Sequence, residues 1–220
     1  MVKKILALTP TPLSRPDDGR GDGGEGPSLA GRRGIFFVIC GPSGAGKTTV
    51  LTRVRKRFPD LVYIPSYTSR PPRSHQELKS GRYRFLSKEE FERRIRRNEF
   101  LEYALYAGHY YGTPRSEVQA ILESGRDVIK EADVQGVRQL RRRRVGGRLI
   151  AIFILPPSLK ELEARLNKRG TESAVARRRR LERVLDELGA LDLFDYIVIN
   201  RQIAQSVERV SAIIRAEREV

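Results

Sequence analysis

The apolar residues of this chain gather in short continuous runs that alternate with amphipathic stretches. Runs at residues 35–40, 149–155 and 196–199 indicate strands covered on both faces, as in a parallel sheet, and a further strand is expected at 127–131. Helices are expected at residues 49–58, 135–144 and 158–168, in an arginine-rich segment after 170, and from about 204. This alternation predicts an α/β fold whose parallel strands are joined by right-handed crossovers.

The alternation is interrupted before the strand at residues 127–131. Residues 63–85 hold short polar and aromatic pieces without a helical period. Residues 100–106 and 109–111 flank an Ala-Gly pair and predict a hairpin. We therefore expect a β-rich insertion within the α/β pattern.

Three helix starts carry capping signals. Ser87 and Glu90 fit a capping box, in which each side chain satisfies the other residue's backbone N–H, and Ser158 begins a second such box. Thr113 is followed by a proline, which predicts an N-cap and then proline at the first position of a helix that runs to about residue 123.

The first part of the chain has a different composition. Residues 9–34 are rich in Pro, Gly, Asp, Arg and Ser, so residues 1–33 are expected to form a disordered tail before one domain at 34–220. No segment approaches the length of a membrane span, and the N-terminal apolar stretch is too short for a secretory signal. The single cysteine, Cys40, excludes a disulfide framework within the chain. A cytoplasmic protein without a membrane partner is expected.

The chain carries a formal net charge of +16, which favours anionic partners such as nucleotides, nucleic acid or a membrane surface. Much of the charge is arginine, in blocks at residues 141–144 and 177–180. The guanidinium fork suits phosphate because it can donate two hydrogen bonds to one group. For the first block, a solvated basic face explains the sequence equally well.

Residues 41–48 match the pattern G-x-x-x-x-G-K-[ST] of a phosphate-binding loop. An apolar strand precedes the loop and a helix follows it, as this motif requires. Glycines let backbone N–H groups surround an anion, the helix adds the positive end of its dipole, and the lysine reaches the β- and γ-phosphates. The threonine hydroxyl is the predicted ligand of Mg²⁺. The ATP site is predicted at Gly41, Pro42, Ser43, Gly44, Ala45, Gly46, Lys47, Thr48 and Thr49.

Beyond this loop, the chain resembles the guanylate kinase family from about residue 34 to 218. The resemblance rests on residues 66–73, 100–103, 110–113, 133–137 and 154–158. It implies a three-layer P-loop fold with a β-rich GMP-binding insertion at about 66–115 and a helical lid at about 165–185. It also implies the transfer of the γ-phosphate of ATP to GMP, with Mg²⁺, giving ADP and GDP.

The resemblance assigns the GMP phosphate to Arg70 and Arg73, helped by the hydroxyls of Tyr83 and Tyr111. The residues themselves agree, since two arginines stiffened by intervening prolines can form a bidentate clamp.

The resemblance assigns base selection to Ser66, Glu102 and Thr113. A carboxylate can accept from N1 and N2 of guanine, and hydroxyls can donate to O6. Adenine lacks those donors and would leave the carboxylate unpaired, so a site of this kind discriminates strongly.

Further residues match the family with some departures. Arg165, Arg169 and Arg180 match arginines of the lid and the ATP side, which implies a catalytic role for them together with Lys47 and Arg70. Glu131, Asp133 and Asn200 match residues that contact GMP, the Mg²⁺ shell or adenine. The family usually has Asp where this chain has Glu131, and Asn-Asp where it has Asn200-Arg201. The loop between Arg73 and Tyr83 is one residue longer than is common.

Three other functions are compatible with parts of this pattern. A related kinase could phosphorylate a ribose phosphate, but the retained base-selecting residues argue against it. A non-catalytic module of the same shape would have lost the functional phosphate loop. A nucleic-acid partner is not expected, because no aromatic stacking platform or groove-reading helix stands out. The sequence leaves open whether the protein is a monomer or a homo-oligomer.

Overall fold

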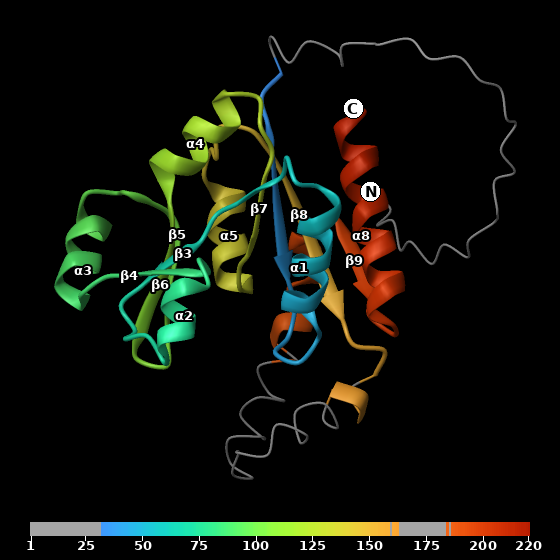
Figure 1. Ribbon diagram of the computed structural model, residues 1–220, viewed down its shortest axis with the longest axis horizontal. Helices are drawn as coiled ribbons and strands as arrows, with labels where there is room; N and C mark the ends of the chain where they lie inside the picture. Colours follow the sequence, from blue (N-terminus) through green and yellow to red (C-terminus); the bar gives the residue numbers. More distant parts are fainter. Residues whose placement is uncertain (1–31, 159, 163–183, 185) are drawn as a thin grey trace, which may run out of the picture.

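A five-stranded parallel sheet runs through the centre of the molecule (Figure 1). The computed structural model describes residues 32–158, 160–162, 184 and 186–220. The strand order is β2 (Val62–Tyr63), β7 (Val128–Glu131), β1 (Ile35–Cys40), β8 (Arg148–Leu155) and β9 (Tyr196–Ile199), and every neighbouring pair is parallel. The predicted α/β fold with a parallel sheet is therefore confirmed.

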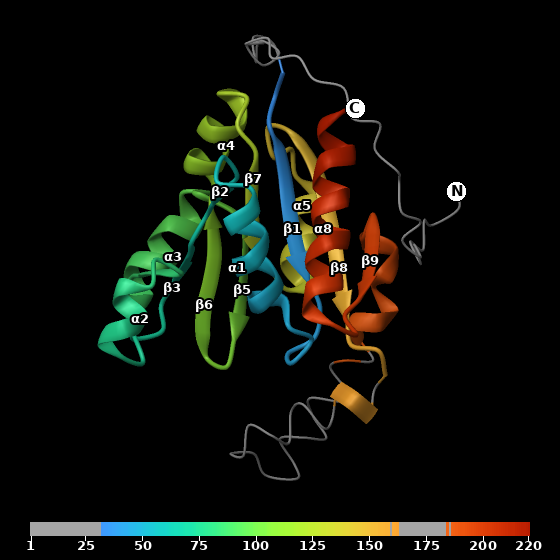
Figure 2. The same cartoon turned by 45° about the vertical axis from the view of Figure 1, so that its right-hand side comes forward.

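Helices cover both faces of this sheet (Figure 2). α1 (Lys47–Arg57) and α8 (Ile203–Arg218) pack on one face, where Phe37 belongs to the buried core. α4 (Arg115–Glu123), α5 (Val134–Arg142) and the short 3₁₀ helix η1 (Leu191–Leu193) pack on the other face, around residues such as Phe36. Because successive side chains of a strand point to opposite faces, all six residues of β1 are buried, as its continuous apolar sequence predicts.

The insertion forms a second, smaller sheet of mixed direction. Its strands lie in the order β4 (Tyr83–Phe85), β3 (Ser66–Thr68), β6 (His109–Pro114) and β5 (Phe100–Tyr106), which includes the predicted hairpin. α3 (Lys88–Arg96) packs against this sheet through Phe91, whose ring stacks on Phe100 with 4.4 Å between ring centroids.

Two of the predicted helix starts are found in the structure. The Ser87 hydroxyl accepts the N–H of Glu90 at 3.1 Å at the start of α3. The Glu90 carboxylate binds the guanidinium groups of Arg93 and Arg94 instead of the Ser87 N–H, so only half of this predicted capping box forms among the described residues. The Ser158 hydroxyl likewise accepts an N–H three residues later, at 3.1 Å.

The predicted cap at Thr113 is wrong. Thr113 and Pro114 are the last residues of β6, and α4 begins only at Arg115, with Pro114 at its N-cap position. The strand continues this far because Thr113 pairs with Glu102 of β5. Its hydroxyl donates to the Glu102 carboxylate instead of capping a helix.

One short helix was not predicted. α2 (His75–Lys79) lies between β3 and β4, and the hydroxyl of Ser74 caps it by accepting the N–H of Glu77 at 3.2 Å. Five residues are too few to show a helical period, but the Ser-x-x-Glu spacing is a helix-start signal that the sequence contains.

Asp127, just before β7, ties together three distant segments at the amino end of the sheet. Its carboxylate accepts the backbone N–H of Ile35 at 2.8 Å and binds Arg218, at the end of α8, at 2.7 Å. Its side chain is 4% exposed, whereas Asp60, which binds the same arginine, is 64% exposed. The two carboxylates share a partner but differ in burial.

This difference predicts unequal costs of removal. Asp127→Ala should lower the free energy of unfolding by about 2–4 kcal/mol, because a buried N–H and a partly buried guanidinium lose their acceptor. Asp60→Ala, the matched control, should cost about 0–1 kcal/mol. Urea unfolding of both variants measures the difference, and equal losses would contradict the role assigned to Asp127.

Candidate active site

The phosphate-binding loop connects β1 to α1 and depends on glycine at defined positions. Gly41, Gly44 and Gly46 have φ angles of +138°, +90° and +90°, a region that other residues rarely adopt. A side chain at Gly41 would also meet the carbonyl oxygen of Ile154 at 2.1 Å. The local sequence is thus required both for the loop's conformation and for its close packing on β8.

Lys47, the first residue of α1, folds back over this loop. Its Nζ donates to the carbonyl oxygens of Gly41 at 2.6 Å and Pro42 at 2.9 Å. The neighbouring Thr48 hydroxyl donates to the Glu131 carboxylate at 3.3 Å, so the end of β7 lies beside the start of α1. An ammonium group and a hydroxyl are therefore held beside the glycine loop.

A cavity of about 720 Å³ lies between this loop and the insertion. It brings together seven of the nine residues predicted for GMP and three of those predicted for ATP, whereas Arg70 and Thr113 are not part of its lining. Its lining includes Gly41, Ser43, Lys47, Ser66, Arg73, Tyr83, Glu102, Tyr111, Glu131 and Asp133. Asp133 also caps α5, since its carboxylate accepts the N–H of Gly136 at 2.7 Å.

Arg70 is held in place by a carboxylate that sequence reasoning missed. Its guanidinium forms a bidentate pair with Glu77 of α2, at 2.7 and 3.1 Å, and its Nε donates to the Tyr111 hydroxyl at 3.2 Å. The hydrogen bonds with Glu77 raise the pKa of Arg70, and the hydrogen bond from Arg70 lowers the pKa of Glu77. Glu77 also accepts the backbone N–H of Arg73 at 2.7 Å, so it orients both predicted phosphate-binding arginines.

The three predicted base-selecting residues meet at one buried point. Thr113 and Glu102 are hydrogen-bonded to each other, and both contact the ammonium group of Lys130. Lys130 also donates to the Ser66 hydroxyl at 3.3 Å. Sequence reasoning missed Lys130, although a lysine directly after Val128 and Ile129 is a charge within a buried strand.

Arg82 is a further residue that was missed. It donates to the Thr48 hydroxyl at 3.1 Å and lies 3.6 Å from the Glu131 carboxylate, so it joins the insertion to the phosphate-binding loop. Nothing in the sequence distinguishes it from the many other arginines of this chain.

A family model described as guanylate kinase matches residues 33–217. The chain belongs to the guanylate kinase family, the ATP:GMP phosphotransferases. A guanylate kinase of Thermotoga maritima is 44% identical over 84% of this chain and 88% of its own length. One of Synechococcus sp. is 40% identical over 86% of each. A solved guanylate kinase from Anaplasma phagocytophilum is 28% identical, with a TM-score of 0.67 over 84% of this chain and 87% of its own.

Asn200, which the guanylate kinase resemblance assigns to adenine, lies beneath the loop in this structure. It is 1% exposed. Its amide donates to the carbonyl oxygen of Ala45 at 2.7 Å and accepts from the Ser206 hydroxyl at 2.8 Å. Asn200 thus connects the loop to α8, and its contact with ATP stays a prediction.

The predicted lid of this guanylate kinase family member, at about 165–185, lies outside the described residues except for Val184, so Arg165, Arg169 and Arg180 are not described. The same holds for the tail up to residue 31. Among the described residues, Val184 at the end of the predicted lid and Glu187 just after it line the cavity.

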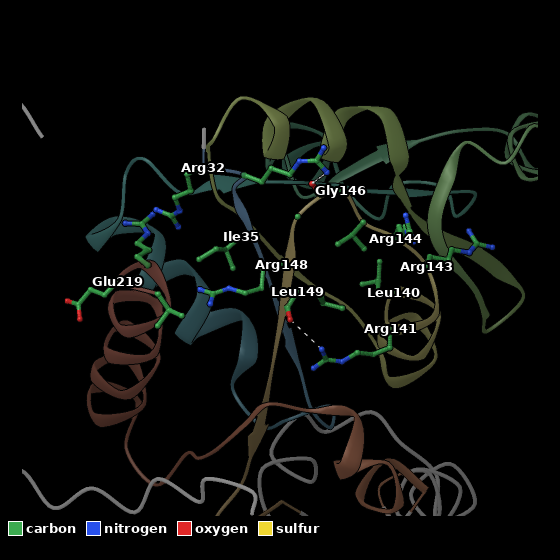
Figure 3. A pocket seen from close by; sticks show the side chains of 15 residues that line it. Arg32, Ile35, Leu140, Arg141, Arg143, Arg144, Gly146, Arg148, Leu149 and Glu219 are labelled. Carbon is green, nitrogen blue, oxygen red and sulfur yellow. Dashed lines mark hydrogen bonds between the residues drawn. The ribbon is translucent and has the colours of Figure 1, made fainter. Parts of the chain in front are cut away.

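The arginine block at residues 141–144 lies away from the cavity of this guanylate kinase domain. It borders a second hollow at the amino ends of β1 and β8, whereas the phosphate-binding loop follows the carboxyl end of β1 (Figure 3). Arg141 donates to the carbonyl oxygens of Leu193 and Leu149 at 3.0 and 3.3 Å and pairs with Asp195. Arg143 donates to the carbonyl oxygen of Phe100 at 2.8 Å. These two arginines hold neighbouring segments together.

No helix in the described part of the chain is both long and apolar enough to cross a membrane.

The position of Asn200 predicts a loss of both stability and ATP binding when it is shortened. Asn200→Ala should lower the free energy of unfolding by about 1–3 kcal/mol, because the Ala45 carbonyl and the Ser206 hydroxyl lose a buried partner. It should also raise the KM for ATP, since the loop loses its support. Gln202→Ala is the matched control, because Gln202 is exposed and its side chain makes no capping bond to α8. If both variants bind ATP like the wild type, Asn200 does not shape the loop.

Proposed function

We propose that this chain transfers the γ-phosphoryl group of ATP to GMP in the cavity between the phosphate-binding loop and the insertion. One observation carries this proposal. The same cavity is lined by Lys47 of the loop, by Arg73, and by the predicted base-selecting residues Ser66 and Glu102. This lining supports a triphosphate site and a guanine site that share one space.

The two ends of the cavity are proposed to bind different substrates. The loop amides and Lys47 hold the phosphates of ATP. Arg70 and Arg73, with the hydroxyls of Tyr83 and Tyr111, hold the phosphate of GMP. Arg70 is suited to this because Glu77 and Tyr111 fix its orientation before the substrate arrives.

The reaction itself needs positioning and charge neutralisation. A phosphate oxygen of GMP attacks the γ-phosphorus, and the bond from this phosphorus to the β–γ bridging oxygen breaks as ADP leaves. Because the attacking group is already an anion, no strong general base is required. Lys47 and the arginines lower the barrier by balancing the charge of the transferred group. The lid arginines Arg165, Arg169 and Arg180 are proposed to join them on the family resemblance alone.

The residues near Thr48 fit a magnesium ion that arrives with ATP. The Thr48 hydroxyl and the Glu131 carboxylate, 3.3 Å apart, are oxygen groups of the kind that Mg²⁺ prefers. Among the described residues no group of three or more His, Cys, Asp or Glu side chains could hold a metal. The ion is therefore proposed to take Thr48 as a ligand together with the phosphates, where it would neutralise their charge.

Two alternatives fit the structure less well. A kinase for a ribose phosphate does not need the buried cluster of Ser66, Glu102 and Thr113, because that substrate carries no base. A non-catalytic binding module does not bind a triphosphate and therefore does not need Lys47 in a glycine loop of this geometry.

An acceptor assay tests the proposal directly. ADP release from ATP and Mg²⁺ should be fast with GMP and slow with AMP, UMP or CMP, each offered separately, because only guanine presents N1 and N2 donors with an O6 acceptor. EDTA should abolish the release. A ribose phosphate is the control for the related kinase, and a release of ADP that follows it instead of GMP would overturn the proposal.

Lys47 should matter for turnover and not for the fold. Lys47→Ala should reduce kcat by about 100-fold or more, because the transferred phosphoryl group loses a preorganised cation. The melting temperature should change little, since Nζ binds only carbonyl oxygens of a partly exposed loop. Lys56→Ala, an exposed lysine on the same helix, is the control and should retain full activity. Normal turnover by Lys47→Ala would contradict the assigned role.

A further inference from the structure

Lys130 is a buried lysine for which the proposed mechanism has no step. It lies in β7 and is 1% exposed, next to the fully buried Ile129. Burial of this degree disfavours an ammonium unless other groups compensate for the lost water. Burial lowers the pKa of Lys130, and the charges and hydrogen bond of Glu102, with the charges of Asp133 and Glu131, act against this effect.

Its ammonium group has three partners on three strands of the insertion. Nζ lies 3.3 Å from the Ser66 hydroxyl on β3 and 3.3 Å from the Glu102 carboxylate on β5, and it contacts the Thr113 hydroxyl on β6. An ammonium has three N–H donors and no acceptor, so it matches these three oxygens in number. The three partners are the same residues that the family resemblance assigns to guanine.

These contacts determine where the hydroxyl protons point. Thr113 accepts from Lys130, and its own proton goes to the Glu102 carboxylate. Ser66 also accepts from Lys130, so its O–H cannot point toward that ammonium. Since Ser66 lines the cavity, its proton is available there as a donor. A donor at this place suits the O6 carbonyl of guanine and opposes the 6-amino group of adenine.

The charge of Lys130 has a second effect, on Glu102. This carboxylate is only 6% exposed, and Lys130 supplies the opposite charge in direct contact. A carboxylate can only accept hydrogen bonds, which suits the N1 and N2 donors of guanine.

We propose that Lys130 is a positioning residue for base recognition: it keeps Ser66 a donor and Glu102 an acceptor, so that the site takes a 2-amino-6-oxopurine and rejects a 6-aminopurine. The inference rests on the proposed function, because it concerns the acceptor of the same reaction. Lys130 acts through its three neighbours and does not line the cavity.

Steady-state kinetics of Lys130→Met test this role. Methionine keeps much of the lysine's length but removes its donors and its charge. The KM for GMP should rise about tenfold to a hundredfold, and the preference for GMP over AMP should fall by a similar factor. The KM for ATP should stay at the wild-type value, which a general loss of structure would not allow. Lys79→Met, an exposed lysine of the insertion, is the matched control and should behave like the wild type.

Two further variants keep the inference testable if Lys130→Met does not fold. Lys130→Gln retains N–H donors without the charge and should recover part of the preference for GMP. Ser66→Ala leaves the pair of Lys130 and Glu102 intact but removes the donor in the cavity, so it should raise the KM for GMP and reduce the preference for GMP over AMP. Melting temperatures of all variants identify the folded ones.

The outcomes separate the two proposals. A wild-type enzyme without GMP-dependent ADP release would reject the proposed function itself. If the wild type uses GMP, and the folded Lys130 variants discriminate between GMP and AMP as the wild type does, then Lys130 has no part in base recognition. Wild-type discrimination by Ser66→Ala would show that Ser66 is not the donor that the inference requires.

Discussion

The central sheet imposes the constraint on which the rest of this molecule depends. Its middle strand, β1, is covered by helices on both faces, and all of its side chains are buried in apolar surroundings. Polar groups with a chemical task are therefore placed mainly where strands end. The phosphate-binding loop follows the carboxyl end of β1, and Glu131 ends the neighbouring β7. Their side-chain contact through Thr48 is a direct result of parallel strands in register.

The smaller sheet of the insertion supplies most of the side chains that are proposed to recognise the acceptor. In the proposed function, the loop amides and Lys47 contact only phosphate oxygens, so the loop does not distinguish one nucleotide from another. The insertion adds a carboxylate, hydroxyls and arginines from strands and turns that face this loop across a cavity. Arg82 makes a direct link between the two parts, through Thr48 and Glu131. In the proposed function, most residues for the acceptor thus come from the smaller sheet, whereas Lys130 and Glu131 of β7 come from the central sheet.

Much of this architecture can be predicted from the sequence, because its signals are local. The apolar run of β1, the glycine loop and the cap at Ser87 each involve residues close together in the chain. The error at Thr113 arose because a local pattern of threonine and proline competed with strand pairing to Glu102, which is eleven positions away.

The missed residues share a different cause. Lys130 has partners 64, 28 and 17 positions away, and Arg82 reaches back 34 positions to Thr48. Contacts between residues so far apart leave no local sequence pattern from which they could be predicted. Glu77 is an intermediate case, because its cap at Ser74 is a local signal, whereas its pairing with Arg70 depends on the path of the intervening turn.

The cluster around Lys130 has a consequence for how such a site can change during evolution. Its four polar side chains come from β3, β5, β6 and β7, and each one is hydrogen-bonded to at least one other member of the cluster. Replacing one member leaves a buried charge or hydroxyl without its counterpart, which costs stability before any new substrate is gained. With the proposed role of Lys130, a change of base preference requires several coordinated substitutions in this cluster. Single substitutions are therefore not expected to change the preferred base.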